Sequence, residues 1–356
     1  MYKASELELK KLLSITLERE ASDLHLVPGE PPIIRVDSTL IRLEDYEVLS
    51  NDSTSELADA MWHEEQKKRF EQNSNVDLSY EFKDNIRFRV NIYKQQGVLS
   101  IALRLVPNHI KTLEELSLPP ILRRFTEHNQ GLVLMVGPTG HGKSTALASL
   151  VNEINNTRAE HILTIEDPVE FIYTPNKSII SQREVFFDTP NFADALKAAL
   201  REDINVVMLG EMRDLESITA TLTLAETGHL IFATLHTNDA AQSIDRIVDV
   251  FPAEQQTQIR AQLASVLQGI VSLRLLPKVG GGRIPAVEIL IANHAVRNSI
   301  RDNKIYEISN IIHTNLEEGM VPLDKALANL VKQGVVELET AQSFVLDREY
   351  FLSLLG

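Results

Sequence analysis

The chain reads Gly137-Pro138-Thr139-Gly140-His141-Gly142-Lys143-Ser144 at residues 137–144, which matches the pattern G-x-x-x-x-G-K-[ST] of a phosphate-binding loop. Glycines let consecutive backbone N–H groups turn inward around a phosphate, and the following helix points the positive end of its dipole at the same charge. Lys143 is therefore expected to bridge the β- and γ-phosphates of ATP, and Ser144 to bind Mg²⁺. With Thr145, the eight residues form the predicted nucleotide-binding segment.

Outward from the loop, short apolar runs alternate with amphipathic segments. The runs at residues 132–136, 162–165, 205–209 and 230–235 are candidates for strands buried on both faces. This alternation predicts an α/β domain with a mostly parallel sheet. Beyond Pro252 the pattern favours helix, with Ile259, Leu263, Val266 and Ile270 on one stripe, a glycine turn at 280–282 and a terminal helical layer.

The N-terminal third has a different texture. A helix is predicted over residues 5–17 and another around 56–70, among short alternating runs that are typical of antiparallel strands. These runs lie at residues 23–27, 33–36, 40–43, 76–82, 86–93 and 98–106. We expect an α+β domain over residues 1–107, a proline-containing linker over 108–120, and the second domain over 121–356, opening with a helix at 121–127.

Composition excludes several classes of function. The 356 residues include 35 Lys and Arg against 50 Asp and Glu, a net charge of −15, so broad attraction to nucleic acid is not expected. The absence of cysteine excludes disulfides, thiolate zinc sites and cysteine nucleophiles. No signal peptide or membrane-spanning run is visible, and we expect a cytoplasmic protein without direct membrane insertion.

Acidic and histidine residues follow three of the predicted buried strands. Glu166 ends one apolar run, Glu211 follows the next, and His236 follows the third. Parallel strands present their carboxyl ends at one edge, where open α/β sheets hold ligands. Hydrolysis of a γ-phosphate needs a group that positions water and an acidic group near Mg²⁺, and these strand ends offer both.

Phosphoryl transfer also calls for an arginine near the developing charge. Arg89 alternates with apolar neighbours on its predicted strand, and Arg104 does so on another, so each is placed on a polar strand face. Arg201 and Arg213, which flank the strand before Glu211, are second candidates. An ordinary solvated strand face is the alternative for Arg89 and Arg104.

Taken together, these motifs resemble the secretion ATPases of type II and type IV pilus systems, and within them the pilus retraction branch. The resemblance extends over most of the chain. It rests on Ala21-Ser22-Asp23-Leu24-His25-Leu26, Phe88-Arg89-Val90-Asn91, the phosphate loop, Thr164-Ile165-Glu166-Asp167-Pro168-Val169-Glu170, Gly210-Glu211-Met212-Arg213-Asp214 and Thr234-Leu235-His236-Thr237-Asn238.

The resemblance implies a PAS-like N-terminal domain, a RecA-like ATPase domain with C-terminal helices, and a homohexameric ring with nucleotide between subunits. It implies that Glu166 is the catalytic base, that Glu211 supports Mg²⁺ directly or through water, that His236 belongs to a histidine box, and that Arg89 and Arg104 reach toward the phosphates. It further implies an inner-membrane platform protein as partner, which holds the ring at the inner face of the membrane, and pilin subunits as indirect partners.

Two departures from the family pattern stand out. Ser299 replaces a leucine in the segment Ala295-Val296-Arg297-Asn298-Ser299-Ile300, which the retraction branch carries near its C-terminus. His141 replaces a small residue of the phosphate loop, where we expect tolerance because the position offers mainly its backbone N–H. Two other functions stay open: an accessory nucleotide-binding ring subunit, and a nucleic-acid translocase, which the acidic charge disfavours.

Overall fold

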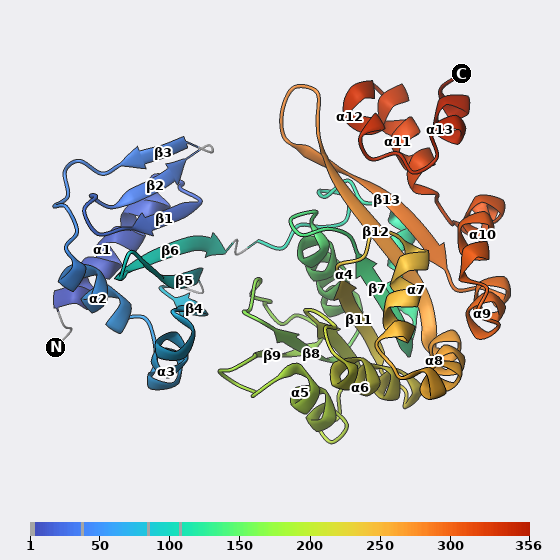
Figure 1. Cartoon of the computed structure of the whole chain (residues 1–356), viewed down its shortest axis with the longest axis horizontal. Helices are drawn as coiled ribbons and strands as arrows, with labels where there is room; N and C mark the ends of the chain where they lie inside the picture. Colours follow the sequence, from blue (N-terminus) through green and yellow to red (C-terminus); the bar gives the residue numbers. More distant parts are fainter. Residues whose placement is uncertain (1–3, 37–38, 84–85, 107–108) are drawn as a thin grey trace. The chain divides into compact units, whose positions relative to one another are not determined.

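The computed structural model describes residues 4–36, 39–83, 86–106 and 109–356. It divides into two compact units, shown in Figure 1. Unit 1 comprises Met1–His109 and Pro168–Ile172, and unit 2 comprises Ile110–Asp167 and Tyr173–Gly356. The predicted boundary at residues 107 and 108 lies outside the described residues. Within the described ranges, none of the helices combines the length and apolar character needed to cross a bilayer.

Unit 1 is an antiparallel sheet with helices, as its alternating pattern predicts. The strand order is β3-β2-β1-β6-β5-β4. The strands are β1 (Asp23–Leu26), β2 (Ile33–Val36), β3 (Thr39–Arg42), β4 (Asn75–Glu81), β5 (Arg87–Gln95) and β6 (Val98–Val106), and the helices are α1 (Ala4–Glu18), α2 (Asn51–Asp59) and α3 (Glu64–Asn73).

The core of unit 1 lies on one face of this sheet. Phe88, Val90 and Ile92 of β5 are fully buried and pack with Leu9 and Leu12 of α1 in one apolar cluster. Because side chains alternate along a strand, the intervening β5 residues occupy the opposite face. That face carries Arg89.

One helix prediction in unit 1 needs correction. The pattern at 56–70 suggests a continuous helix, whereas the chain forms α2 and α3 with a break between them. Ser50 caps α2 through its side chain, and the Gln66 side chain accepts from the backbone N–H of His63 at the start of α3. These local caps begin two helices where periodicity alone suggests one.

Unit 2 is built on a seven-stranded sheet of order β13-β12-β7-β11-β10-β8-β9. All neighbouring strands are parallel except β12 and β13. The strands are β7 (Gly131–Val136), β8 (His161–Glu166), β9 (Ile179–Glu184), β10 (Val206–Leu209), β11 (Leu230–Leu235), β12 (Leu267–Pro277) and β13 (Arg283–Ile291). Every residue of β7, β10 and β11 is buried, which confirms the reading of their apolar runs as strands covered on both faces.

Helices surround this sheet and form a terminal layer after β13 (Figure 1). They are α4 (Lys143–Thr157), α5 (Phe192–Ala199), α6 (Leu215–Glu226), α7 (Ala240–Asp249), α8 (Ala253–Val266), α9 (His294–Arg301), α10 (Ile308–Thr314), α11 (Leu323–Lys332), α12 (Leu338–Gln342) and α13 (Arg348–Leu355), with 3₁₀ turns η1 (Pro120–Glu127), η2 (Ile305–Glu307) and η3 (Leu316–Glu318). The predicted α/β fold with a C-terminal helical layer is confirmed, although residues 121–127 form a 3₁₀ rather than an α-helix.

The prediction of a mainly helical chain beyond Pro252 is wrong for one stretch. The helical stripe stops at Val266, and Ile270 lies in strand β12, which pairs with β7 on one side and β13 on the other. Gly280, Gly281 and Gly282 join β12 to β13, each with positive φ. The hairpin of β12 and β13 therefore contacts β7, the strand that precedes the phosphate loop, and also the terminal helices.

The terminal helices pack on the far end of that hairpin. Leu276 of β12 and Ala286 of β13 share a buried cluster with Leu323, Leu327 and residues further along the C-terminal layer. The buried carboxylate of Asp324 accepts hydrogen bonds from the backbone N–H groups of Leu346 and Asp347, each at 2.8 Å. These bonds hold the segment between α12 and α13 in place.

Candidate nucleotide site

The phosphate loop joins β7 to α4, as the motif predicts. Gly137 has a φ of 140°, and a Cβ there would lie 2.6 Å from the Leu273 carbonyl oxygen of β12, so only glycine fits. Gly140 and Gly142 also have positive φ, and Gly142 is the N-cap of α4. The N-terminus of a fifteen-residue helix therefore opens directly from the loop, which suits it to bind an anion.

Lys143 is folded back on this loop. Its Nζ donates to the carbonyl oxygens of Gly137 at 2.8 Å and Pro138 at 3.1 Å. The residue is 7% exposed, so burial of its ammonium group is offset by these charge-assisted bonds. The ammonium group lies within the turn that the motif assigns to phosphate.

His236 connects the loop to the strand ends. Its Nδ1 lies 3.3 Å from Lys143 Nζ and 3.2 Å from Thr139 Oγ1, while its Nε2 lies 3.4 Å from Glu211 Oε2. An ammonium group can only donate, so Nδ1 accepts from it and the proton of the neutral ring is on Nε2, facing Glu211. The imidazole thus bridges Lys143 and the carboxylate.

Glu211 follows β10 and is held by more than His236. Its Oε2 also pairs with Arg213 Nε at 2.7 Å. The Met212 N–H donates to the Thr234 carbonyl at 3.1 Å, which ties this segment to β11. Arg213, one of the two second candidates among the arginines, therefore lies beside the predicted metal-supporting carboxylate.

Glu166 closes strand β8 and is 5% exposed. The Thr164 hydroxyl donates to its Oε1 at 2.8 Å. Its backbone is next to the Glu211 segment, because Gly210 N–H donates to the Ile165 carbonyl at 2.8 Å. Three predicted site residues, Glu166, Glu211 and His236, thus occupy the carboxyl ends of neighbouring strands, at the edge where the phosphate loop begins.

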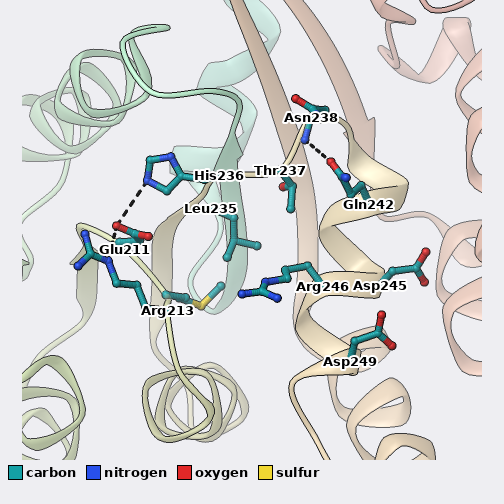
Figure 2. Close-up of a pocket in the computed structure, with 11 residues that line it drawn as sticks. Glu211, Arg213, Leu235, His236, Thr237, Asn238, Gln242, Asp245, Arg246 and Asp249 are labelled. Carbon is teal, nitrogen blue, oxygen red and sulfur yellow. Dashed lines mark hydrogen bonds and ion pairs between the residues drawn. The ribbon is translucent and has the colours of Figure 1, made fainter.

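A pocket of about 520 Å³ opens beside this edge. Figure 2 shows Glu211 and His236 facing one another on one side of it and α7 on the other. Asp245, Arg246 and Asp249 of α7 also line it. Burial, with the nearby charges of Asp249 and Asp239, raises the pKa of Asp245.

Arg89 and Arg104 belong to unit 1, and the site just described is built from unit 2 alone. They are register partners on β5 and β6. Arg104 Nε donates to Asp23 Oδ1 at 2.8 Å, and Arg89 pairs with Asp77 at 3.9 Å and with Glu170 at 3.3 Å. Burial would raise the pKa of Asp23, but hydrogen bonds from Ser22 and Arg104 together lower it. Each arginine thus has a carboxylate partner.

Arg201, the other second candidate, lies in the turn after α5.

His141 makes side-chain contacts in addition to offering its backbone N–H to the loop. The Leu275 N–H of β12 donates to its Nδ1 at 3.0 Å, and its ring meets the edge of the Phe344 ring with centroids 6.2 Å apart. Burial, with the charges of Arg274, Lys143 and Arg283, lowers the pKa of His141. The motif leaves this position open, so the pattern carries no signal for a side-chain role.

The donor set suits Mg²⁺ bound together with a nucleotide. Ser144 offers an exposed hydroxyl in the first turn of α4, and Glu211 offers a carboxylate. Mg²⁺ usually takes one or two protein oxygens and completes its shell with waters and phosphate oxygens. Among the described residues, no cluster of three His, Cys, Asp or Glu side chains suited to a metal occurs.

The loop, its helix and the strand-end carboxylates on a parallel sheet define a P-loop ATPase. The chain belongs to the family described as type II/IV secretion system protein, whose model matches residues 4–338. It is 44% identical to the type IV pilus retraction ATPase PilT of Pseudomonas aeruginosa over 94% of this chain and 97% of that protein. It is 36% identical to the type IV pilus ATPase PilU of the same organism over 94% of this chain and 88% of that protein.

A solved structure agrees with these relatives. The crystal structure of the pilus retraction motor PilT with bound ADP is 43% identical in sequence and superposes with a TM-score of 0.88, covering 98% of this chain and 99% of that chain. The resemblance to secretion ATPases, the two-domain fold and the assignment as an ATPase are therefore confirmed.

Proposed function

We propose that the chain is a Mg²⁺-dependent, ATP-hydrolysing motor that assembles as a homohexamer and powers type IV pilus retraction. The observation that carries the proposal is the similarity to the retraction ATPase over nearly the whole chain, at 44% identity. The site supports it, because the loop lysine, the two strand-end glutamates and the histidine are all present and three of them are in contact.

In this proposal each residue has a defined task. Lys143 exchanges its loop carbonyls for the β- and γ-phosphate oxygens, while backbone N–H groups of residues 137–145 surround the phosphates. Glu166 accepts a hydrogen bond from the attacking water and takes its proton. His236, held between Lys143 and Glu211, links the loop to the carboxylate.

Ser144 and Glu211 would hold Mg²⁺, Glu211 directly or through water. When bound, the ion neutralises charge on the β- and γ-phosphate oxygens. The chain's own residues then orient the nucleotide: Gly137 allows the close approach of loop and β12, and Arg213 holds the Glu211 carboxylate.

The hexameric ring is proposed because phosphoryl transfer calls for an arginine near the developing charge, and a neighbouring subunit can supply it on the side of the nucleotide opposite Lys143. Arg89 and Arg104 of unit 1 are proposed to reach toward the phosphates of a nucleotide between subunits. Their carboxylate partners, which also belong to unit 1, must then release them, so nucleotide binding competes with these ion pairs. An inner-membrane platform protein is the proposed partner that keeps the ring at the inner face of the membrane. The pilin subunits that are withdrawn are the proposed indirect partners.

ATP hydrolysis by the purified chain and pilus phenotype in cells test the proposal together. Lys143→Ala is expected to lose both nucleotide binding and turnover, whereas Glu166→Gln loses turnover but keeps binding. Glu216→Gln, an exposed carboxylate on α6, is the matched control. Unchanged turnover in both site variants would refute the site assignment.

In cells, deletion of the gene is expected to give excess surface pili without twitching motility. Wild type should restore motility and Lys143→Ala should not. If pili disappear on deletion, the protein drives pilus assembly and the retraction assignment fails. Sedimentation of the nucleotide-bound protein checks the hexamer, and a persistent monomer at micromolar concentration contradicts it.

An accessory nucleotide-binding ring subunit is the second candidate, because the chain is similar to two different type IV pilus ATPases of one organism, PilT and PilU. A complete set of Lys143, Glu166, Glu211 and His236 favours the principal motor instead, since an accessory subunit has less need of all four. Near-wild-type motility in the deletion strain, together with slow turnover of the purified chain, would favour the accessory role.

A further inference from the structure

The side chain of His141 contacts strand β12 beyond the point where the neighbouring strand β7 ends. Strand β7 pairs with β12 as far as Val136 opposite Ser272, and then turns into the phosphate loop. Strand β12 continues to Pro277, so Leu275 lies beyond the end of β7. Its backbone N–H donates to His141 Nδ1 instead of to a strand.

The backbone on either side of His141 is otherwise easily deformed. Gly140 and Gly142 flank it with φ of 80° and 85°, and nothing lies within 4 Å of a Cβ built on either glycine. Glycine has the widest range of backbone conformations. The imidazole is therefore a side-chain tether between the middle of the loop and β12.

The same ring touches the C-terminal layer. Phe344 meets it in an edge-on arrangement with an interplanar angle of 66°. Phe344 packs against the buried cluster that contains Leu276 and Leu327, and the Asp324 carboxylate fixes the backbone two and three residues further on. The His141 ring thus contacts β12 through Nδ1 and the C-terminal helical layer through Phe344.

We propose that His141 is a positioning residue for nucleotide binding, which holds the phosphate loop against β12 and couples the loop to the C-terminal helices through Phe344. The inference rests on nucleotide binding at this loop but requires neither the hexamer nor pilus retraction. His141 acts through the loop backbone, so it is expected to change affinity for nucleotide more than the rate of the chemical step.

The tether depends on the state of the ring. A backbone N–H only donates, so Nδ1 must be unprotonated, and a protonated imidazole cannot accept this bond. The charged groups that face it are Lys143 of α4, Arg274 of β12 and Arg283 of β13, all cationic. They disfavour protonation, and acidification is expected to release the tether.

ADP binding with Mg²⁺, measured by calorimetry from about pH 8 to about pH 5.5, tests the proposal. His141→Ala should raise the Kd for ADP about 3- to 10-fold, the effect of one lost hydrogen bond, and raise KM for ATP more than it lowers kcat. His141→Asn places an amide oxygen near the position of Nδ1 and should restore binding at pH 8. Because that amide does not titrate, the ratio of wild-type to His141→Asn Kd should rise on acidification, while titration of the nucleotide cancels.

Phe344→Leu tests the coupling to the helices. It should weaken ADP binding in the wild-type background and have a smaller effect in the His141→Asn background. Equal effects in both backgrounds, or an unchanged Kd in His141→Ala, would overturn the proposal.

Lys143→Ala in the same assay separates this inference from the function. If Lys143→Ala abolishes binding and His141→Ala does not weaken it, only the role of His141 falls. If Lys143→Ala binds ADP like wild type, the loop is not the nucleotide site and both proposals fail.

Discussion

The Nε2 of His236 lies 3.4 Å from Glu211 Oε2 while the Nδ1 of the same ring lies 3.3 Å from Lys143 Nζ. A single imidazole therefore touches both the lysine of the phosphate loop and the strand-end carboxylate. His236→Ala is expected to reduce ATP turnover about 100-fold and to leave ADP binding in place, since one preorganised contact near the developing charge is lost. Steady-state ATPase rates check this. Asp249→Asn, in the same pocket but on α7, should turn over like wild type, and a fully active His236→Ala would contradict the role of the ring.

The buried carboxyl group of Glu288 is expected to make the free energy of unfolding depend on pH. Burial and nearby Asp239 raise its pKa to about 7, against the ordinary value of 4.5, although the Ala240 N–H and Arg274 oppose the rise. The folded state favours the protonated carboxyl, so this stabilisation is complete below about pH 4.5 and is lost as the pH rises through about 7. At about 1.4 kcal/mol for each pH unit, the loss is roughly 3 kcal/mol.

Thermal denaturation from about pH 5 to about pH 8 measures this effect. Wild type should lose Tm across this interval, and Glu288→Gln, which cannot ionise, should lose much less. The exposed Glu317→Gln should follow wild type. Parallel curves for wild type and Glu288→Gln would show that the buried carboxyl has no such effect.

Gly269 is required by packing and not by backbone conformation. A Cβ there would lie 2.3 Å from the ring of Phe125 and 2.8 Å from the Leu290 carbonyl oxygen. Gly269→Ala is therefore expected to reduce the free energy of unfolding by about 3 kcal/mol, measured by urea denaturation. Gly281→Ala at the hairpin tip, with open space but a φ of +102°, should cost about 1 kcal/mol. Equal stability of the two variants would contradict the close approach of Phe125.

Ser299 has a partner that accounts for its polar side chain. Its Oγ donates to Glu307 Oε2 at 3.0 Å, and the residue is 4% exposed. Ser299→Ala is expected to reduce the free energy of unfolding by about 1.5 kcal/mol, and Ser299→Leu by more, because it adds volume to a buried position as well. Tm measurements check the order, and a more stable Ser299→Leu variant would contradict it. ATP turnover of the purified protein should be unchanged in both.

The strands that hold the site could be predicted because burial on both faces leaves an unmistakable apolar run, as at Val206–Leu209. Strand β12 could not, since Ile270 continues the helical spacing of Ile259, Leu263 and Val266 although the chain changes structure at Leu267. Strand β9 has only Glu184 buried and lacks an apolar pattern altogether. Pairing with another strand decides both cases: β12 pairs with β7, which is remote in sequence, and β9 pairs with β8.

The candidate site follows the same division. The loop and the placement of Glu166, Glu211 and His236 at strand ends follow from local pattern and the rule that parallel strands end together. The contacts of His141 with Leu275 and Phe344 join segments more than a hundred residues apart, and no spacing in the sequence encodes them. The roles of Arg89 and Arg104 depend on a neighbouring subunit and stay a prediction.

Lys143 already has oxygen partners, the carbonyls of Gly137 and Pro138. Nucleotide binding at this loop is therefore an exchange reaction for the ammonium group and not a simple addition. The net gain is the difference between phosphate and carbonyl oxygens as acceptors, and that difference grows with the negative charge of the ligand. On the proposed role of Lys143, a nucleoside without a β-phosphate leaves the lysine on the loop carbonyls, and the loop is expected to discriminate by charge even before shape is considered.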